Sequence, residues 1–326
     1  MCDLDAEKVG NGIAEYGGRG TQNFDDLLND PEVELVTIAT PVTTHAALAK
    51  KALRAGKHVL LEKPIATSVA EADELIAVAK ASKGVLCIDH QRRFFANQKV
   101  VRNVVQSGQL GQVLSVRIDL PMPSGAGVNQ PADPATFKKR FFPTHVYDYL
   151  VHHVDQLCVL LGEKPRQVYA RYQTLAGCDL PCEIEISLTM PSGVLASASL
   201  RLSHAPDTKW AVDGDKASLR MQFANDMVNG LIYQRQPDGS LKTWEIQPPH
   251  LVNTLDAESG QWRAKKGCEV HGYTPLDAHL EFYQHLFVAI RNGGPVPASP
   301  EDARDAIQII WLAIESARVG QVVNWS

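Results

Sequence analysis

Cysteine, long apolar runs and excess positive charge are all scarce in this chain of 326 residues. Its six cysteines are scattered, and the closest pair, Cys178 and Cys182, has no second pair at the spacing of a zinc site. We therefore expect reduced thiols, with neither a disulfide framework nor a bound metal.

No stretch approaches the roughly 18 uninterrupted apolar residues of a membrane span. The first residues include Asp3, Asp5, Glu7 and Lys8, so they lack the apolar core of a signal peptide. Lys and Arg number 32 against 37 Asp and Glu, a formal net charge of -5, whereas nucleic-acid binding usually needs a basic face. These features predict a cytoplasmic protein with no membrane or nucleic-acid partner.

The first third of the chain alternates strand-like and helix-like segments. A β-branched run at 33–40, typical of a strand buried on both faces, is followed by a helical pattern at 45–56 that Thr43 or Thr44 can cap. Shorter strands are expected at 57–64 and 85–90, with a helix capped by Ser68 between them. Repeated β-α-β units predict a doubly wound parallel sheet, an α/β fold of the Rossmann type.

Beyond residue 91 the pattern changes. Helices are expected at 98–106, 146–161, 277–292 and 300–319, and a strand at 112–120. Several β-like runs fill the region between about residues 166 and 236, with turn signals at 191–193 and 238–239. We predict an incomplete dinucleotide-binding domain over 1–91, and over 92–326 a second α/β domain with a large, mostly antiparallel open sheet and C-terminal helices.

The tripeptide Glu62-Lys63-Pro64 follows an expected parallel strand, and ligands of open α/β sheets bind at the carboxyl ends of the strands. Pro64 stiffens the turn, and a partly buried Lys63 can stabilise a developing alkoxide. The plainer alternative is a solvated lysine paired with Glu62.

On a helix over 147–162, Asp148, His152 and Asp155 are spaced i, i+4 and i+7 and share one face. An acid one turn away can orient a histidine that acts as a general base. The alternative is an ion pair on the helix surface, and His153, about 100° further round, is expected to be a neighbour only.

The glycines between Gly10 and Gly18 imitate a phosphate-binding turn. No strand precedes Gly10, and Glu15 is too bulky for the third glycine position. A helix that ends at Gly17-Gly18 is the better interpretation.

Together these segments resemble the Gfo/Idh/MocA oxidoreductases, named after glucose–fructose oxidoreductase and inositol dehydrogenase. The resemblance rests on "ATP" followed by His45, "AGKHVLLEKP", "QRRF" at 91–94, "SGQLGQV" at 107–113 and the D-x-x-x-H-x-x-D helix, and it extends through the C-terminal tail. It implies a nicotinamide-dependent dehydrogenase of sugars, polyols or related hydroxy compounds. It also implies a homo-oligomer, a dimer or tetramer formed through the open sheet.

The resemblance assigns roles residue by residue. Lys63 matches a lysine that contacts the substrate and the nicotinamide ribose, His152 the base, and Asp148 the acid that positions the base or the substrate. Asp3 matches the acid at the end of the second strand, which favours NAD over NADP. The further cofactor-side or substrate-side positions are Thr40, Pro41, His45, Glu62 and Arg92.

Two departures from the family pattern lead to further expectations. Thr144, His145 and Tyr149 stand where the family usually has glycines, which leaves the substrate shape open. The first strand, glycine-rich turn and first helix are expected to be missing, with a short orphan strand near Asn23 and Phe24, so NAD should bind weakly or not at all. A sensor of a sugar-like ligand and an NAD-using glycosidase are the alternatives.

Overall fold

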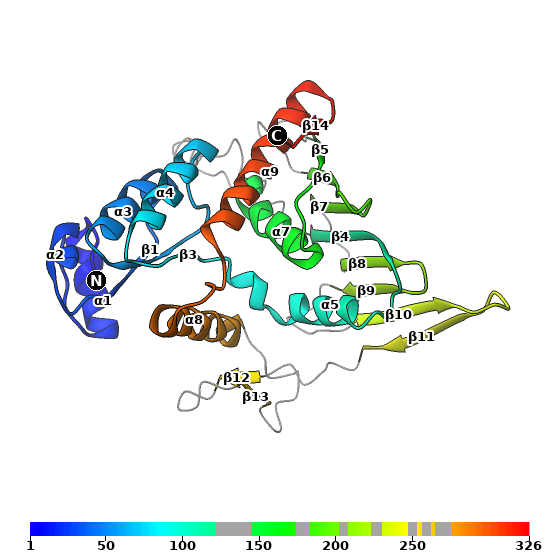
Figure 1. Ribbon diagram of the computed structural model, residues 1–326, viewed down its shortest axis with the longest axis horizontal. Helices are drawn as coiled ribbons and strands as arrows, with labels where there is room; N and C mark the ends of the chain where they lie inside the picture. The colour runs from blue at the N-terminus through cyan, green and yellow to red at the C-terminus, as the bar shows by residue number, and fades with distance from the viewer. Residues whose placement is uncertain are drawn as a thin grey trace. The chain divides into compact units, whose positions relative to one another are not determined.

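The computed structural model describes residues 1–121, 145–173, 183–201, 208–222, 230–246, 253–255, 262–264 and 275–325. Within these ranges the side chains of 121, 145–148, 208, 222, 253–255, 262–264 and 275–276 are not described. The chain divides into two compact units (Figure 1). The first is Met1–Asp89 with Asn292–Arg304, and the second is His90–Arg291 with Asp305–Ser326.

The first unit is built on three parallel strands in the order β1-β2-β3. These strands are β1 (Leu35–Ile38), β2 (His58–Leu61) and β3 (Leu86–Ile88), with helices α3 (Val42–Arg54) and α4 (Val69–Ala81) in the connections. The predicted parallel β-α-β arrangement is confirmed.

Strands β2 and β3 are buried along almost their whole length, as the apolar runs predict. Strand β1 instead alternates, with Val36 and Ile38 buried but Leu35 and Thr37 exposed. The expectation that this strand is buried on both faces was wrong. Among the described residues β1 and β3 are both edge strands of this sheet, and of the two only β1 leaves alternate side chains exposed.

The glycine-containing N-terminal segment is helical, as predicted. Helix α1 (Ala6–Tyr16) begins at Asp5, whose carboxylate accepts from the Glu7 and Lys8 amides, and it ends at Gly17, with φ of 75°. Because residues 10–16 are helical, their amides bond within the helix and form no phosphate nest.

The orphan strand expected near Asn23 and Phe24 was misplaced. Cys2 pairs with Thr21 in an isolated parallel bridge, whereas Asn23 caps helix α2 (Phe24–Asn29) by accepting from the Asp25 amide. An asparagine side chain that can satisfy a free helix amide favours the cap over a strand.

The two helices that cross the sheet begin differently. Ser68 caps α4 by accepting from the Glu71 amide at 3.1 Å, as predicted. The predicted cap of α3 by Thr43 or Thr44 was wrong, because the helix begins after Pro41 with no side-chain cap. Thr44 lies inside the helix and its hydroxyl donates to the Pro41 carbonyl. Proline supplies a preset φ for entry into a helix.

The second unit contains a nine-stranded sheet in the order β11-β10-β9-β8-β4-β7-β6-β5-β14. Among these described strands only β4 and β7 pair in parallel; the other neighbours are antiparallel, as predicted for most of the sheet. The strands are β4 (Val113–Pro121), β5 (Gln167–Gln173), β6 (Glu183–Thr189), β7 (Leu195–Arg201), β8 (Thr208–Gly214), β9 (Ser218–Gln222), β10 (Gly230–Arg235), β11 (Leu241–Glu245) and β14 (Val323–Asn324). A separate pair is formed by β12 (Asn253–Leu255) and β13 (Trp262–Ala264).

One face of this sheet is apolar and packed. Ile118 of β4, Ala198 of β7 and Trp210 of β8 are fully buried, and α7 (His145–Leu161) packs on β7 and β4. The Ser316 hydroxyl of α9 (Pro300–Val319) accepts from the Ala170 amide of β5. The other helices in the described part of this unit are η1 (Gln91–Phe94), α5 (Ala96–Gln106) and α8 (Pro275–Asn292). Successive residues of a strand point to opposite faces, so the polar residues between these apolar ones lie on the other face of the sheet.

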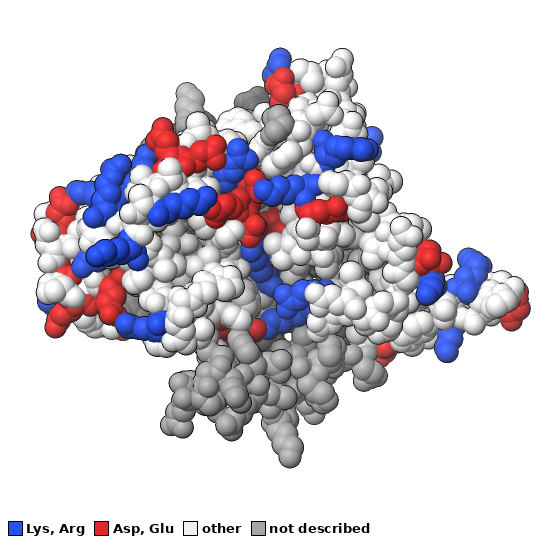
Figure 2. All heavy atoms as spheres, viewed as in Figure 1, with Lys and Arg blue, Asp and Glu red and all other residues white. Residues whose placement is uncertain are grey.

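Ion pairs on the surface of the first unit include Lys51 with Asp25 and Arg304 with Asp73. On the face drawn in Figure 2, Lys and Arg side chains alternate in small groups with Asp and Glu. Within the described ranges, no helix combines the length and the apolar composition that crossing a bilayer requires.

Helix capping gives a first prediction. Replacing Ser68 by Ala removes the acceptor of the Glu71 amide and should lower the free energy of unfolding by about 1 kcal/mol. Thr43→Ala is the matched control, because Thr43 is an exposed residue in the first turn of α3 and makes no capping hydrogen bond. Urea unfolding of both variants measures the difference; a loss of stability in Thr43→Ala would instead support threonine capping of α3.

Candidate active site

The three strands of the first unit end in polar loops at one edge of the sheet. Thr40 and Pro41 follow β1, Glu62 and Lys63 follow β2, and Asp89 follows β3. The Glu62 amide donates to Ile38 O and the Asp89 amide donates to Leu61 O, so each acidic residue extends the backbone ladder by one rung. The carboxyl edge of a parallel sheet is where this class of fold binds ligands.

His45 of α3 links two of these loops. It is buried, and its ring nitrogens lie 2.8 Å from two carbonyl oxygens, Nδ1 from Pro64 O and Nε2 from Thr40 O. A neutral imidazole donates to one of these oxygens, whereas an imidazolium donates to both. The side chain therefore connects the loop after β1 to the loop after β2 and orders both.

Glu62 and Asp89 form a carboxyl pair at the same edge. Burial, followed by the charge and the hydrogen bond of Glu62, raises the pKa of Asp89 to about 7. Asp89 is 5% exposed, and its Oδ1 has no hydrogen-bond partner among the described residues. Glu62 also accepts from the Lys63 amide at 3.2 Å. Lys63 is half-buried beside this pair in the chain.

Asp3 lies at the N-terminal bridge of the first unit. It directly follows Cys2, which pairs with Thr21, and its Oδ1 accepts from the Asp5 amide at 2.9 Å. Asp3 is half-buried.

In the second unit, His152 of α7 lies in a buried polar cluster. Its ring meets the His90 ring edge-on at a centroid distance of 5.6 Å. His90 Nδ1 lies 3.6 Å from Asp155 Oδ2. Arg93 donates two hydrogen bonds to the same carboxylate, from Nε to Oδ2 at 2.9 Å and from Nη2 to Oδ1 at 2.5 Å. His152 is therefore next to an ordered ion pair.

The pKa values of this cluster follow from its charges. Burial alone raises the pKa of Asp155, but Arg93 and His90 outweigh it and hold that pKa below the ordinary value. Burial, with the charges of Arg92 and Lys209, lowers the pKa of His153 to about 3, so this histidine is neutral near pH 7. His153 Nδ1 lies 3.1 Å from the Tyr149 carbonyl oxygen.

Arg92 lies in η1 and is half-buried, and its carbonyl accepts from Gln156 Nε2 of α7. Asp148 belongs to α7 by its backbone, but its side chain lies outside the described residues, as does Thr144. The described side chains include no group of three or more His, Cys, Asp or Glu that could hold a metal ion.

Sequence reasoning missed Asp89, His90 and Arg93 as members of these clusters. The signal for the first two was available, because they follow β3 just as Glu62 and Lys63 follow β2. Arg93 had no such signal, because its partner Asp155 lies 62 residues along the chain.

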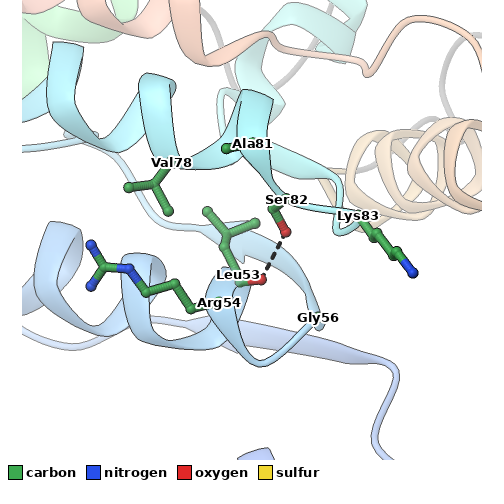
Figure 3. A pocket seen from close by; sticks show the side chains of 7 residues that line it. All are labelled: Leu53, Arg54, Gly56, Val78, Ala81, Ser82 and Lys83. Atoms are coloured by element: carbon green, nitrogen blue, oxygen red, sulfur yellow. Dashed lines mark hydrogen bonds between the residues drawn. The ribbon is translucent and has the colours of Figure 1, made fainter.

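A groove of about 420 Å³ in the first unit lies at the C-terminal ends of α3 and α4. Figure 3 shows Leu53, Val78 and Ala81 on its walls and the Ser82 hydroxyl donating to the Leu53 carbonyl. Arg54 and Lys83 flank it. These helix ends precede β2 and β3, so the groove is at the amino edge of the sheet, opposite the polar loops.

Residues 2–90 match the oxidoreductase family with an NAD-binding Rossmann fold, and residues 99–220 match the GFO/IDH/MocA C-terminal domain. The chain belongs to the Gfo/Idh/MocA oxidoreductase family. Within this family it is 42% identical over 297 residues to the uncharacterized oxidoreductase YdgJ of Escherichia coli K12, covering 90% of this chain and 81% of YdgJ. It is 35% identical over 150 residues to the uncharacterized oxidoreductase YhhX of that strain, covering 46% of this chain and 41% of YhhX.

Solved structures with low sequence identity share the fold. Levoglucosan dehydrogenase, in a complex with NADH and levoglucosan, superposes with a TM-score of 0.80 at 21% identity. The match covers 99% of this chain and 88% of that one. The predicted α/β architecture, with a Rossmann-type parallel sheet and a large mixed sheet, is that of the family.

The Arg93–Asp155 pair gives a second prediction. Arg93→Met leaves the buried Asp155 carboxylate without its bidentate partner and should cost about 3–5 kcal/mol of unfolding free energy at pH 7. The low folded-state pKa of Asp155 stabilises the protein above its unfolded pKa, and this stabilisation is lost as pH falls through the folded pKa. The cost of Arg93→Met in urea unfolding should therefore shrink as pH falls below about 4.

The double variant Arg93→Met/Asp155→Leu is the control, because it removes both charges and should recover part of the loss. A cost below about 1 kcal/mol for Arg93→Met would mean that the pair behaves like an exposed salt bridge.

Proposed function

We propose that this protein is an NAD-dependent dehydrogenase that transfers a hydride between the nicotinamide and a sugar, polyol or related hydroxy compound. Family membership and the polar loops at the carboxyl edge of the parallel sheet support the proposal together. Levoglucosan, named in the complex of a protein with the same fold, is a compound of this class. Residues 1–91 would form the cofactor domain and 92–326 the substrate and oligomerisation domain.

The donor set of the first unit fits the ribose and nicotinamide side of such a cofactor. Asp3 would accept from a ribose hydroxyl and repel a 2′-phosphate, which favours NAD over NADP. The remaining cofactor-side positions are Thr40, Pro41, His45, Glu62, Lys63 and Arg92. Among the described residues of this unit no glycine-rich turn joins a strand to a helix, so the pyrophosphate has no counterpart there.

The bound nicotinamide would accept or donate the hydride. Lys63 would hold the reacting hydroxyl oxygen and stabilise negative charge on it, and His152 would remove the hydroxyl proton. Asp148 would orient the base or the substrate. The neutral His153 has no such role in the proposal, because its low pKa keeps it from taking up a proton near pH 7.

A ligand sensor is the second candidate. The helical state of residues 10–16 favours it, because these glycines supply no amides to a phosphate group. A glycosidase that uses NAD transiently is a further alternative, which these residues do not separate from a dehydrogenase.

We also propose that the polar face of the nine-stranded sheet joins two copies of the chain. On this face Asp119 of β4 accepts from Arg117 Nε at 2.8 Å and from the Ser199 hydroxyl. Arg201 donates to the Ser199 hydroxyl at 3.0 Å. Asp119 is only 7% exposed, and Arg117 and Arg201 balance its charge before another chain covers it.

The third prediction concerns turnover. Lys63→Met and His152→Ala should each lower kcat on the preferred sugar or polyol by about 100-fold or more, because each removes a group that handles the hydroxyl or its proton. NAD affinity, measured by calorimetry, should survive in both variants.

Lys83→Met is the matched control, because Lys83 lies at the opposite edge of the sheet. Near-wild-type turnover in either test variant removes that residue from the mechanism. Binding of a sugar without any turnover supports the sensor, and release of a hydrolysed glycoside supports the glycosidase.

The fourth prediction concerns assembly. Ser187 of β6 and Ser197 of β7 pair at the centre of the polar face, and Ser197 also pairs with Arg117 of β4. Ser187→Arg/Ser197→Arg should convert a dimer or tetramer into smaller species in light scattering, because it adds bulk and like charge. Thr43→Arg on α3 is the control. An unchanged mass for the double variant would exclude this face.

A further inference from the structure

Two carboxyl groups stand side by side where the parallel sheet of the first unit ends. Glu62 and Asp89 each follow the last residue of neighbouring strands β2 and β3, and their amides are fixed by the Ile38 and Leu61 carbonyls. Strand pairing therefore sets the distance between the two residues. The two backbones cannot separate unless the ladder opens, so only rotation of a side chain can part the two carboxyl groups.

The surroundings of Asp89 oppose a second negative charge. Asp89 is 5% exposed and one of its oxygens has no hydrogen-bond partner among the described residues. Two carboxylates in such a place cannot both ionise at low cost, and one of them retains a proton. The rise in the pKa of Asp89 to about 7, caused by burial and then by Glu62, agrees with this geometry.

We propose that Glu62 and Asp89 share one proton at neutral pH, and that Asp89 is a positioning residue that holds the Glu62 carboxyl in place through this proton. Glu62 is then bonded from two sides, by Asp89 and by the Lys63 amide. When the proton leaves, the buried Asp89 stays and the half-buried Glu62 turns away. The order of the loop that carries Lys63 thus depends on one proton.

The neighbouring charges allow this arrangement. Glu62 is the charged group that acts on Asp89, as its charge and hydrogen bond both raise that pKa. His45 of α3 faces the Thr40 and Pro64 carbonyl oxygens, and Lys63 follows Glu62 in the same loop. His90, the next residue after Asp89, has its ring against Asp155 and His152.

Isotope-edited NMR of the 326-residue chain tests the shared proton without any cofactor. The Asp89 carboxyl carbon, identified by its loss in Asp89→Asn, should titrate near pH 7. In Glu62→Gln this titration should move toward the ordinary range, because the neighbouring negative charge is gone. Titration of Asp89 near pH 4 in the wild-type chain would overturn the proposal.

Urea unfolding supplies the second measurement. A raised folded-state pKa stabilises the protein below the unfolded pKa near 4, and this stabilisation is lost as pH rises to about 7. The urea concentration that half-unfolds the wild-type protein should therefore decrease as pH rises from 5 to 7.5, compared with Asp89→Asn. Above pH 8 the two proteins should change with pH in the same way. The amide introduced by Asp89→Asn donates permanently to Glu62, so that variant should show no such fall. An equal fall in both proteins contradicts the shared proton.

NAD binding tests whether Asp89 positions Glu62 or only fills space in the fold. Of the three experiments, this one alone rests on the proposed function. Wild-type NAD affinity should weaken several-fold from pH 6.5 to 8.5, Asp89→Asn should keep one affinity throughout, and Asp89→Ala should be weak at every pH. NAD affinity that follows the same pH profile in wild type and Asp89→Asn overturns the positioning role. If NAD binds to none of them, the proposed function fails, and the NMR and unfolding results still decide the shared proton.

Discussion

Parallel pairing of β1, β2 and β3 is the constraint on which the candidate site of the first unit depends. Because the strands run the same way, the residues that leave them meet at one edge although they are separated by about 25 positions in the chain. The ladder extends past the strand ends to the amides of Glu62 and Asp89. Side chains that follow the strands are therefore held by backbone hydrogen bonds before any ligand arrives.

Much of the carboxyl edge of the parallel sheet was predictable from the sequence. Contacts between side chains from different strands and helices at that edge were not. The buried runs of β2 and β3, the Ser68 cap and the position of Glu62-Lys63-Pro64 directly after a strand were predicted correctly, because each depends on residues close in the chain. The predicted cap by Thr43 or Thr44 was wrong, because where α3 begins depends on how the helix packs on the sheet and not on the local sequence alone. Exposure of Leu35 likewise depends on which strands lie beside β1.

The second unit shows the same division. Periodicity placed His152 and Asp155 on one helix, which α7 confirms. Arg93, which sets the charge state of Asp155, comes from η1 far earlier in the chain, and no local pattern connects the two. The two adjacent histidines are both buried: desolvation lowers the pKa of His153, and the ring of His152 lies edge-on to that of His90. The residue types were visible in the sequence, and their protonation states required the packing.

Asp89 and Asp155 show how far packing decides chemistry. Both are almost fully buried aspartates, so desolvation pushes the pKa of each upward. Asp155 meets the guanidinium of Arg93 and stays a carboxylate. Asp89 meets the carboxyl of Glu62, and a proton between them costs less than a second charge. The same side chain thus serves as a fixed anion in one unit and as a titrating group near pH 7 in the other. Only the titrating one can couple the order of its loop to pH.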